Sequence, residues 1–161
     1  MSSPSESFLN CDLQIRLLPH YEGLPLPRYM TEGSSGLDLY AAIASPVELP
    51  AGKRGLIPAG IQIALPHGFE AQVRPRSGLA LKEGITLLNA PGTIDSDYRG
   101  EIQVILFNTH STSFKIERGM RIAQLVIAPI VKARLVVVDK LGDTARGSGG
   151  FGHTGHAISH S

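Results

Sequence analysis

Residues 89–100 read Asn-Ala-Pro-Gly-Thr-Ile-Asp-Ser-Asp-Tyr-Arg-Gly, and the apolar run 102–107 follows almost directly. The Pro-Gly turn ahead of a strand predicts a β-hairpin with Asp95, Asp97 and the ring of Tyr98 at its base. Backbone groups of a hairpin can pair with a flat polar heterocycle, a carboxylate can activate water, and a ring can stack on a sugar or base. The segment therefore indicates a site for nucleotide hydrolysis.

Composition sets bounds on the kind of protein. The chain has 161 residues, 42% of them hydrophobic, with no Trp and a formal net charge of +1. This length suits a single domain, whose core must consist mainly of Val, Ile, Leu and Ala. Because Lys and Arg are scattered, we expect neither a nucleic-acid polymer nor a membrane as partner. The single cysteine, Cys11, excludes an intramolecular disulfide and fits a reducing compartment.

No stretch of the sequence indicates secretion or membrane insertion. Residues 1–10 lack the basic and apolar pattern of a secretory signal. The longest apolar stretch, 122–131, is interrupted by Gln124 and Pro129 and is too short to span a bilayer. We expect a cytoplasmic protein.

Short apolar runs recur along the chain between 18 Gly and 11 Pro residues. Many short strands at close spacing predict an all-β sandwich or barrel. Ile61, Ile63 and Leu65 alternate with polar or small residues, as in a half-buried strand. The best helix candidate is one or two turns near 78–82. The runs expected as strands are 13–18, 56–57, 61–65, 69–73, 85–88, 102–107, 122–127 and 135–138.

The chain divides into three parts by composition. Residues 1–10 are Ser-rich and polar, residues 11–141 hold the apolar runs, and residues 142–161 are rich in Gly, Ser and His. We therefore expect a flexible N-terminus, one β domain and a flexible tail. Because the tail carries Arg146 and Phe151, we interpret it as a strap that orders over a ligand.

Two short segments suit a phosphate site. Arg76-Ser77-Gly78 combines a bidentate donor, a hydroxyl and a glycine that lets backbone approach closely; an exposed basic turn is the alternative. Asp38 is a lone acid between Leu37 and Leu39, and it suits either a metal or a buried arginine.

Arg121 and Gln124 lie three residues apart, just before and inside an apolar run. In a regular strand, residues three apart point to opposite faces. We therefore expect Arg121 to form a salt bridge with a carboxylate while Gln124 faces a ligand.

Several known chemistries lack their motifs. Residues 147–152 match G-x-G-x-x-G, but the sequence around them does not predict the strand, helix and later acid that a dinucleotide site needs, and there is neither a P-loop nor a G-x-S-x-G elbow. His153, His156 and His160 are interpreted as solvated tail histidines rather than a metal site. Water activated by a carboxylate, with a hard divalent cation on phosphates, remains the plausible scheme.

Five segments, in this order, resemble the motifs of the trimeric dUTP diphosphatase (dUTPase) family. They are 33–39 (GSSGLDL), 75–78 (PRSG), 89–100 (NAPGTIDSDYRG), 118–124 (RGMRIAQ) and 146–155 (RGSGGFGHTG). The resemblance implies a jelly-roll subunit in a homotrimer with active sites at the subunit interfaces. It implies hydrolysis of dUTP to dUMP and pyrophosphate with Mg²⁺ on the triphosphate, an activity that cleans the nucleotide pool and supplies dUMP for thymidylate synthesis.

The resemblance also implies roles for single residues. Asp95 matches the catalytic carboxylate that deprotonates the attacking water, and Tyr98 matches the ring that packs under the deoxyribose. The residues matched to base contacts are Asn89, Thr93, Ile94 and Phe151, with Gln103 at a variable substrate-contact position. Those matched to phosphate contacts are Arg76, Ser77, Gly78, Gln124, Arg146 and Thr154, and Asp38 matches an acid that holds Mg²⁺ through water.

Two other functions fit the same scaffold. A dCTP deaminase would need an acid that moves protons at the cytosine ring, for which Glu101 is the candidate, but it would lack the pattern of Asp95 and Tyr98. A regulatory nucleotide-binding protein would be expected to lose Asp95 or Arg146, and both are present.

Overall fold

The structure is a computed structural model that describes residues 10–149. The chain divides into two units, residues 1–131 and residues 132–161. The first unit contains one 3₁₀ helix, η1 (Pro19–Tyr21), and one α-helix, α1 (Ser77–Glu83), among its described residues. Its strands are β1 (Gln14–Leu17), β2 (Leu37–Tyr40), β3 (Val47–Leu49), β4 (Arg54–Pro58), β5 (Ile61–Ala64), β6 (Phe69–Arg74), β7 (Ile85–Leu87), β8 (Gly92–Ile94), β9 (Gln103–Asn108), β10 (Phe114–Ile116) and β11 (Arg121–Pro129).

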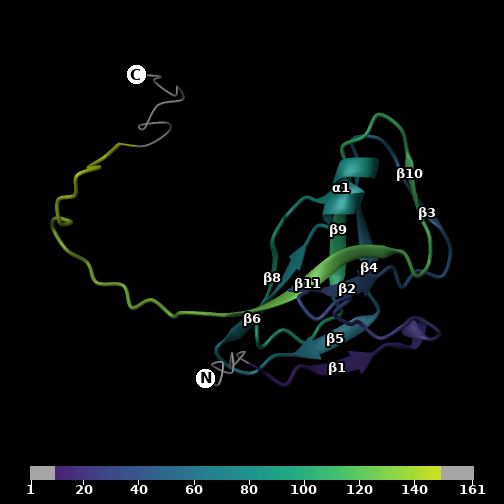
Figure 1. Cartoon of the computed structure of the whole chain (residues 1–161), viewed down its shortest axis with the longest axis horizontal. Coiled ribbons are helices and arrows are strands. Elements are labelled where there is room, and N and C mark those ends of the chain that lie inside the picture. The colour runs from purple at the N-terminus through teal and green to yellow at the C-terminus, as the bar shows by residue number, and fades with distance from the viewer. Residues whose placement is uncertain (1–9, 150–161) are drawn as a thin grey trace, which may run out of the picture. The chain divides into compact units, whose positions relative to one another are not determined.

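The strands form four antiparallel sheets. Their orders are β2-β11-β6-β8, β4-β9-β7, β1-β5 and β10-β3. Figure 1 shows α1 at one end of this unit and the β1-β5 pair at the opposite end. The all-β fold predicted from the sequence is confirmed, and the helix expected near 78–82 lies within α1.

The core is aliphatic, as the composition requires. Ile61 and Ile63 on β5 are buried while Gln62 and Ala64 are only partly covered, which matches the predicted alternation. Central strands contribute fully buried Val104, Leu106 and Leu125, whose removal from water is the main source of stability.

The hairpin predicted from residues 89–107 is wrong. β8 pairs with β6, whereas β9 pairs with β4 and β7 in another sheet. The segment between β8 and β9 is a turn. Its Asp95 and Tyr98 are exposed and do not belong to a strand. Residues 89–100 therefore connect two sheets, which leaves a hollow between β8 and β9.

The strand predicted at 135–138 is also wrong, because residues 132–149, the described part of the second unit, contain no strand. Leu135 is 91% exposed and Val137 98% exposed. An apolar run alone is therefore not sufficient for a strand, which also needs a neighbouring strand to pair with. Three strands of three residues, β3, β8 and β10, were not predicted because their runs are too short to stand out. Within residues 10–149, no helix is long and apolar enough to cross a membrane.

Candidate active site

One pocket opens between β8 and β9, and we call it the β8–β9 pocket. Buried aliphatic side chains of β6, β7 and β9 form its floor, which suits the flat face of a ring. Its polar wall comes from the segment around β8. The lining residues are Val73, Leu87, Asn89, Gly92, Thr93, Ile94, Asp95, Tyr98, Glu101, Ile102, Gln103, Val104 and Ile105.

The turn that follows β8 is held by its own hydrogen bonds. The Tyr98 amide donates to the Asp95 carbonyl (3.1 Å), and the Tyr98 hydroxyl donates to the Glu101 carbonyl (3.1 Å). Arg99 Nη1 donates to the carbonyls of Ser96 (2.7 Å) and Tyr98 (2.8 Å). The turn is therefore fixed by hydrogen bonds to its own backbone carbonyls, three of them donated by side chains, while the Asp95 carboxylate stays exposed to solvent.

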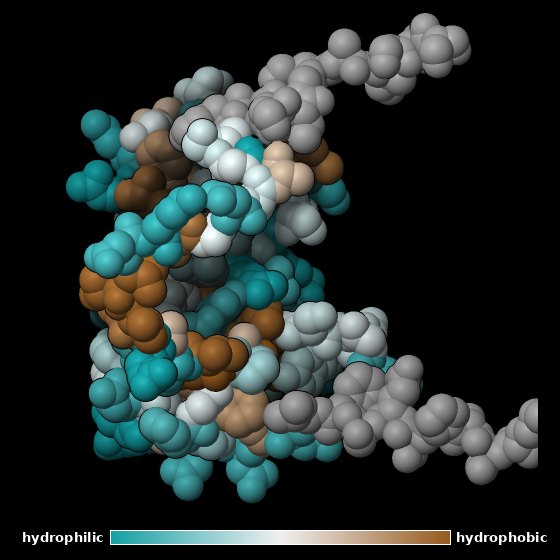
Figure 2. Space-filling view, turned by 90° about the vertical axis from the view of Figure 1, so that its left-hand side faces the viewer, coloured by the Kyte–Doolittle hydropathy of each residue, from teal (hydrophilic) through white to brown (hydrophobic). Residues whose placement is uncertain are grey.

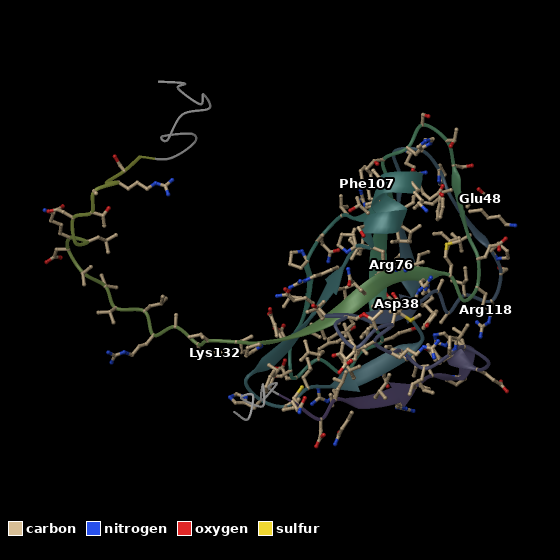
Figure 3. The ribbon with its side chains drawn as sticks, in the orientation of Figure 1. Asp38, Glu48, Arg76, Phe107, Arg118 and Lys132 are labelled. Carbon is tan, nitrogen blue, oxygen red and sulfur yellow. The ribbon has the colours of Figure 1, made fainter. Side chains whose placement is uncertain are left out.

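A second pocket lies beside β2 and the start of α1, and we call it the β2–α1 pocket. At its base, Asp38 Oδ1 is 3.2 Å from Arg76 Nε, and Asp38 Oδ2 is 3.2 Å from Arg121 Nη1. Figure 3 shows Asp38 and Arg76 together in the body of the first unit. The lining residues are Met30, Ser34, Ser35, Gly36, Asp38, Arg76, Ser77, Gly78, Arg121 and Gln124.

This pocket carries a net positive charge. Two guanidinium groups face one carboxylate, whose side chain is only 9% exposed. The arginine side chains are more exposed, at 28% for Arg76 and 41% for Arg121. One arginine charge therefore remains uncompensated next to the Ser77 hydroxyl and Gly78, a combination that suits phosphate oxygens.

The pairing of Asp38 with arginine, one of its two sequence interpretations, is present, and so is the salt bridge predicted for Arg121. The prediction that Arg121 and Gln124 face opposite ways is wrong. A register shift between Arg121 and Ala123 interrupts the pairing of β11 with β2. Ile122 and Ala123 are consequently both buried, and Arg121 and Gln124 both line the β2–α1 pocket.

The two pockets divide the site residues predicted from the sequence. Asn89, Thr93, Ile94, Asp95, Tyr98 and Gln103 all line the β8–β9 pocket. Asp38, Arg76, Ser77, Gly78 and Gln124 all line the β2–α1 pocket. No residue lines both pockets. Arg146 lies in a turn of the second unit, where its Nε donates to the Gly149 carbonyl (2.8 Å), and Phe151 and Thr154 lie outside the described residues.

Sequence reasoning missed Met30, which lines the β2–α1 pocket but belongs to none of the five motifs and has no local signal in the sequence. Glu101, which the sequence suggested only as the acid of a deaminase, lines the β8–β9 pocket.

The model of the dUTPase family matches residues 22–155. The chain belongs to the dUTPase family. It is 56% identical over 145 residues to a deoxyuridine 5'-triphosphate nucleotidohydrolase of Rhizobium etli, covering 89% of this chain and 93% of the relative. The family predicted from the five motifs is thereby confirmed.

Solved dUTPase structures share this fold. The dUTPase of Staphylococcus bacteriophage 80alpha with dUpNHpp has a TM-score of 0.80 and 26% identity, covering 90% of this chain and 99% of that one. A dUTPase mutant from phage phi11 of S. aureus, described with a structural Mg(II) ion, has a TM-score of 0.73 and 23% identity. That match covers 82% of this chain and 99% of the other, and it concerns the fold alone.

Proposed function

We propose that this chain hydrolyses dUTP to dUMP and pyrophosphate, as a dUTP diphosphatase. The observation that carries the proposal is the exposed Asp95 carboxylate in one pocket with the Tyr98 ring and the Asn89 amide. Membership of the dUTPase family supports it. We place the enzyme in the cytoplasm, where it would limit dUTP and supply dUMP.

The β8–β9 pocket would bind the nucleoside. Asn89 and the backbone of Thr93 and Ile94 would read the uracil edge, and Tyr98 would lie under the deoxyribose, where a 2'-hydroxyl has no room. Gln103 stands at the start of β9 beside them. Phe151 would cap the ring.

Asp95 would act as the general base. Its carboxylate would orient one water molecule in line with the α-phosphorus and accept its proton as the P–O bond forms. The bond to the pyrophosphate oxygen breaks, and the negative charge that leaves with pyrophosphate has to be stabilised.

The β2–α1 pocket would bind the phosphates. Arg76 is held by Asp38 and by its own Nη1 donating to the Arg121 carbonyl (3.2 Å), so it is oriented before substrate arrives. Ser77, Gly78 and Gln124 stand at the same pocket and would add donors. Gln124 Nε2 already donates to the Pro75 carbonyl (2.9 Å), which orders the loop ahead of α1.

The residues of the β2–α1 pocket fit a Mg²⁺ ion that arrives bound to the phosphates of the substrate. Within residues 10–149, no group of three His, Cys, Asp or Glu residues could hold a metal. Both Asp38 oxygens face arginines, so a direct bond to a metal would compete with two ion pairs. Mg²⁺ usually keeps waters and binds one or two carboxylates plus substrate phosphates. It would therefore sit on the triphosphate, neutralise its charge and contact Asp38 through water.

The active site would form between copies of this chain in a homotrimer. The two pockets share no residue, although one nucleotide needs both a base site and a phosphate site. Large hydrophobic side chains of the first unit are exposed, and hydrophobic residues reach the surface in Figure 2. Burying such residues, which include Leu26, Leu56, Leu81 and Leu88, between identical subunits would stabilise the assembly.

The tail, residues 142–161, would complete the site through Arg146, Thr154 and Phe151. We expect a truncation that removes residues 146–161 to fold normally and to lose activity by about 10²-fold, the scale of losing an electrostatic contact to developing charge. Circular dichroism and pyrophosphate release measure the two properties. A folded truncated protein with full activity would contradict the role of the tail.

The first test is pyrophosphate release from dUTP, dTTP, dCTP and UTP, with and without Mg²⁺. We expect release from dUTP alone, stimulated by Mg²⁺. Ammonia release from dCTP would favour a deaminase, and binding without turnover would favour a regulatory protein. The deaminase is disfavoured because Glu101 Oε1 accepts the Gly60 amide (2.9 Å) and lies 2.7 Å from His20 Nε2, so that oxygen is already engaged.

A further inference from the structure

Three segments far apart in the sequence meet at Glu101, at the wall of the β8–β9 pocket. The carboxylate oxygen Oε1 accepts the Gly60 amide (2.9 Å) and lies 2.7 Å from His20 Nε2. His20 belongs to η1, 81 residues away along the chain. We call these three residues the His20 brace. None of them lies in the five family motifs.

The two supports of Glu101 are themselves held firmly. Gly60 has φ +68°, and a Cβ there would lie 2.6 Å from the Ala42 Cβ and 2.9 Å from Tyr21 Cδ2. Its carbonyl accepts the Leu18 amide (2.9 Å), which ties it to the start of η1. Tyr21 is only 2% exposed and anchors η1 in the core. The backbone on which both supports stand is therefore fixed, while the His20 side chain is 39% exposed.

Glu101 in turn holds the Tyr98 ring. Its carbonyl accepts the Tyr98 hydroxyl (3.1 Å), so one residue links the brace to the tip of that ring. Gln62 on β5 supports the same stretch, because its Nε2 donates to the Arg99 carbonyl (2.8 Å).

The ring also lies against Gly100. A Cβ added at Gly100 would lie 3.0 Å from Tyr98 Cε2 and closer still to its hydroxyl oxygen. A methyl group at this position would push the ring outward, since the ring tip can move and the neighbouring backbone is fixed. Glycine at position 100 thus leaves room for the tip of the Tyr98 ring.

We propose that His20, acting through Glu101, positions the Tyr98 ring and so sets how strongly the enzyme prefers a 2'-deoxyribose to a ribose. The inference rests on the proposed function, because it uses the contact of Tyr98 with the sugar. Without His20, the Glu101 carboxylate keeps the Gly60 amide as one of its two contacts. The peptide that receives the Tyr98 hydroxyl then relies more on its own N–H, which Ile102 donates to the Ile61 carbonyl (2.9 Å). The ring would then yield to a 2'-hydroxyl, while Asp95 and the β2–α1 pocket stay unchanged.

The test compares kcat/KM for dUTP and UTP in the full chain. We expect His20→Ala to lower the dUTP to UTP ratio about fivefold, which corresponds to about 1 kcal/mol, the size of one ordinary hydrogen bond. The change should appear in KM more than in kcat. His20→Gln, whose amide nitrogen can reach Glu101, should recover most of the ratio. His67→Ala is the matched control, because His67 is exposed in the turn between β5 and β6.

Gly100→Ala displaces the same ring by another route, because its methyl group would meet the ring tip. It should lower the dUTP to UTP ratio at least as much, about tenfold, with little loss of thermal stability. A folded His20→Ala protein with an unchanged ratio would overturn the inference, whatever the result for Gly100→Ala. A fall of kcat for both nucleotides in equal proportion would also overturn it, since that indicates general damage. If the unaltered chain does not hydrolyse dUTP, the proposed function fails first and the inference fails with it.

Discussion

The β2–α1 pocket and the β8–β9 pocket are built on different physical principles. In the β2–α1 pocket, a buried carboxylate holds two arginines in place, so its geometry depends on charge. In the β8–β9 pocket, hydrogen bonds to backbone carbonyls and aliphatic packing fix the frame, and the Asp95 carboxylate stands exposed. The same change, loss of one aspartate charge, should therefore have different consequences in the two pockets.

Asp95→Asn should separate activity from stability most clearly. We expect kcat to fall about 10³-fold, within the range of general-base contributions. The melting temperature should stay unchanged, because an exposed carboxylate contributes little to folding. Pyrophosphate release and differential scanning calorimetry measure the two effects. Asp12→Asn, an exposed aspartate ahead of β1, is the control.

A large fall in the stability of Asp95→Asn would show that its pocket also depends on charge, and the contrast between the pockets would disappear.

Asp38→Ala should lower both properties together. Removing the carboxylate leaves two arginines facing each other, and breaking a buried ion pair costs up to about 3–5 kcal/mol. Because both arginines are partly exposed, we expect a smaller loss of unfolding free energy, about 1–3 kcal/mol. Activity should fall about tenfold or more because Arg76 and Arg121 lose their fixed positions.

Urea unfolding and kcat/KM for dUTP check this outcome. Glu117→Ala, which breaks the exposed pair of Lys115 and Glu117 (2.9 Å), is the matched control and should change neither quantity. An Asp38→Ala protein with full stability would contradict the claim that the ion pairs of Asp38 hold the pocket together.

The smallest effect concerns Tyr21, the last residue of η1 and the neighbour of His20 in the chain. Burial, with a smaller contribution from Tyr40, raises the pKa of Tyr21 from 10.0 to about 12. Its hydroxyl donates to the Pro25 carbonyl (2.6 Å), so Tyr21→Phe should cost about 1 kcal/mol at neutral pH. A raised folded-state pKa means that Tyr21 stabilises fully below pH 10 and loses this contribution as the pH rises toward about 12.

The stability difference between wild type and Tyr21→Phe should therefore shrink between pH 10 and pH 12, as urea unfolding at several pH values would measure. A difference that is constant over this range would mean that burial of the hydroxyl does not govern its ionisation.

Features that depend on neighbouring residues in the sequence could be predicted, whereas features that depend on distant residues could not. Alternation at Ile61 and Ile63 revealed a strand, and the grouping of Asp95 with Tyr98 indicated a pocket, because both patterns are local. The partner of β8 and the contact of His20 with Glu101 depend on residues far away in the chain. The shift between Arg121 and Ala123 was hidden because two adjacent buried residues also occur in regular, fully covered strands.

The central claim is that one active site combines the β8–β9 pocket of one copy with the β2–α1 pocket of another. Co-refolding Asp95→Asn with Asp38→Ala subunits tests it directly, since each variant lacks a different pocket. Random mixing at equal amounts should raise activity to about a quarter of wild type, because half of each pocket type is intact, whereas Asp38→Ala alone keeps about a tenth or less. A mixture of Asp95→Asn with Tyr98→Ala, both altered in the β8–β9 pocket, should restore none. Absence of recovery in the first mixture, with mixed oligomers present, would contradict the claim and place the whole site within a single chain.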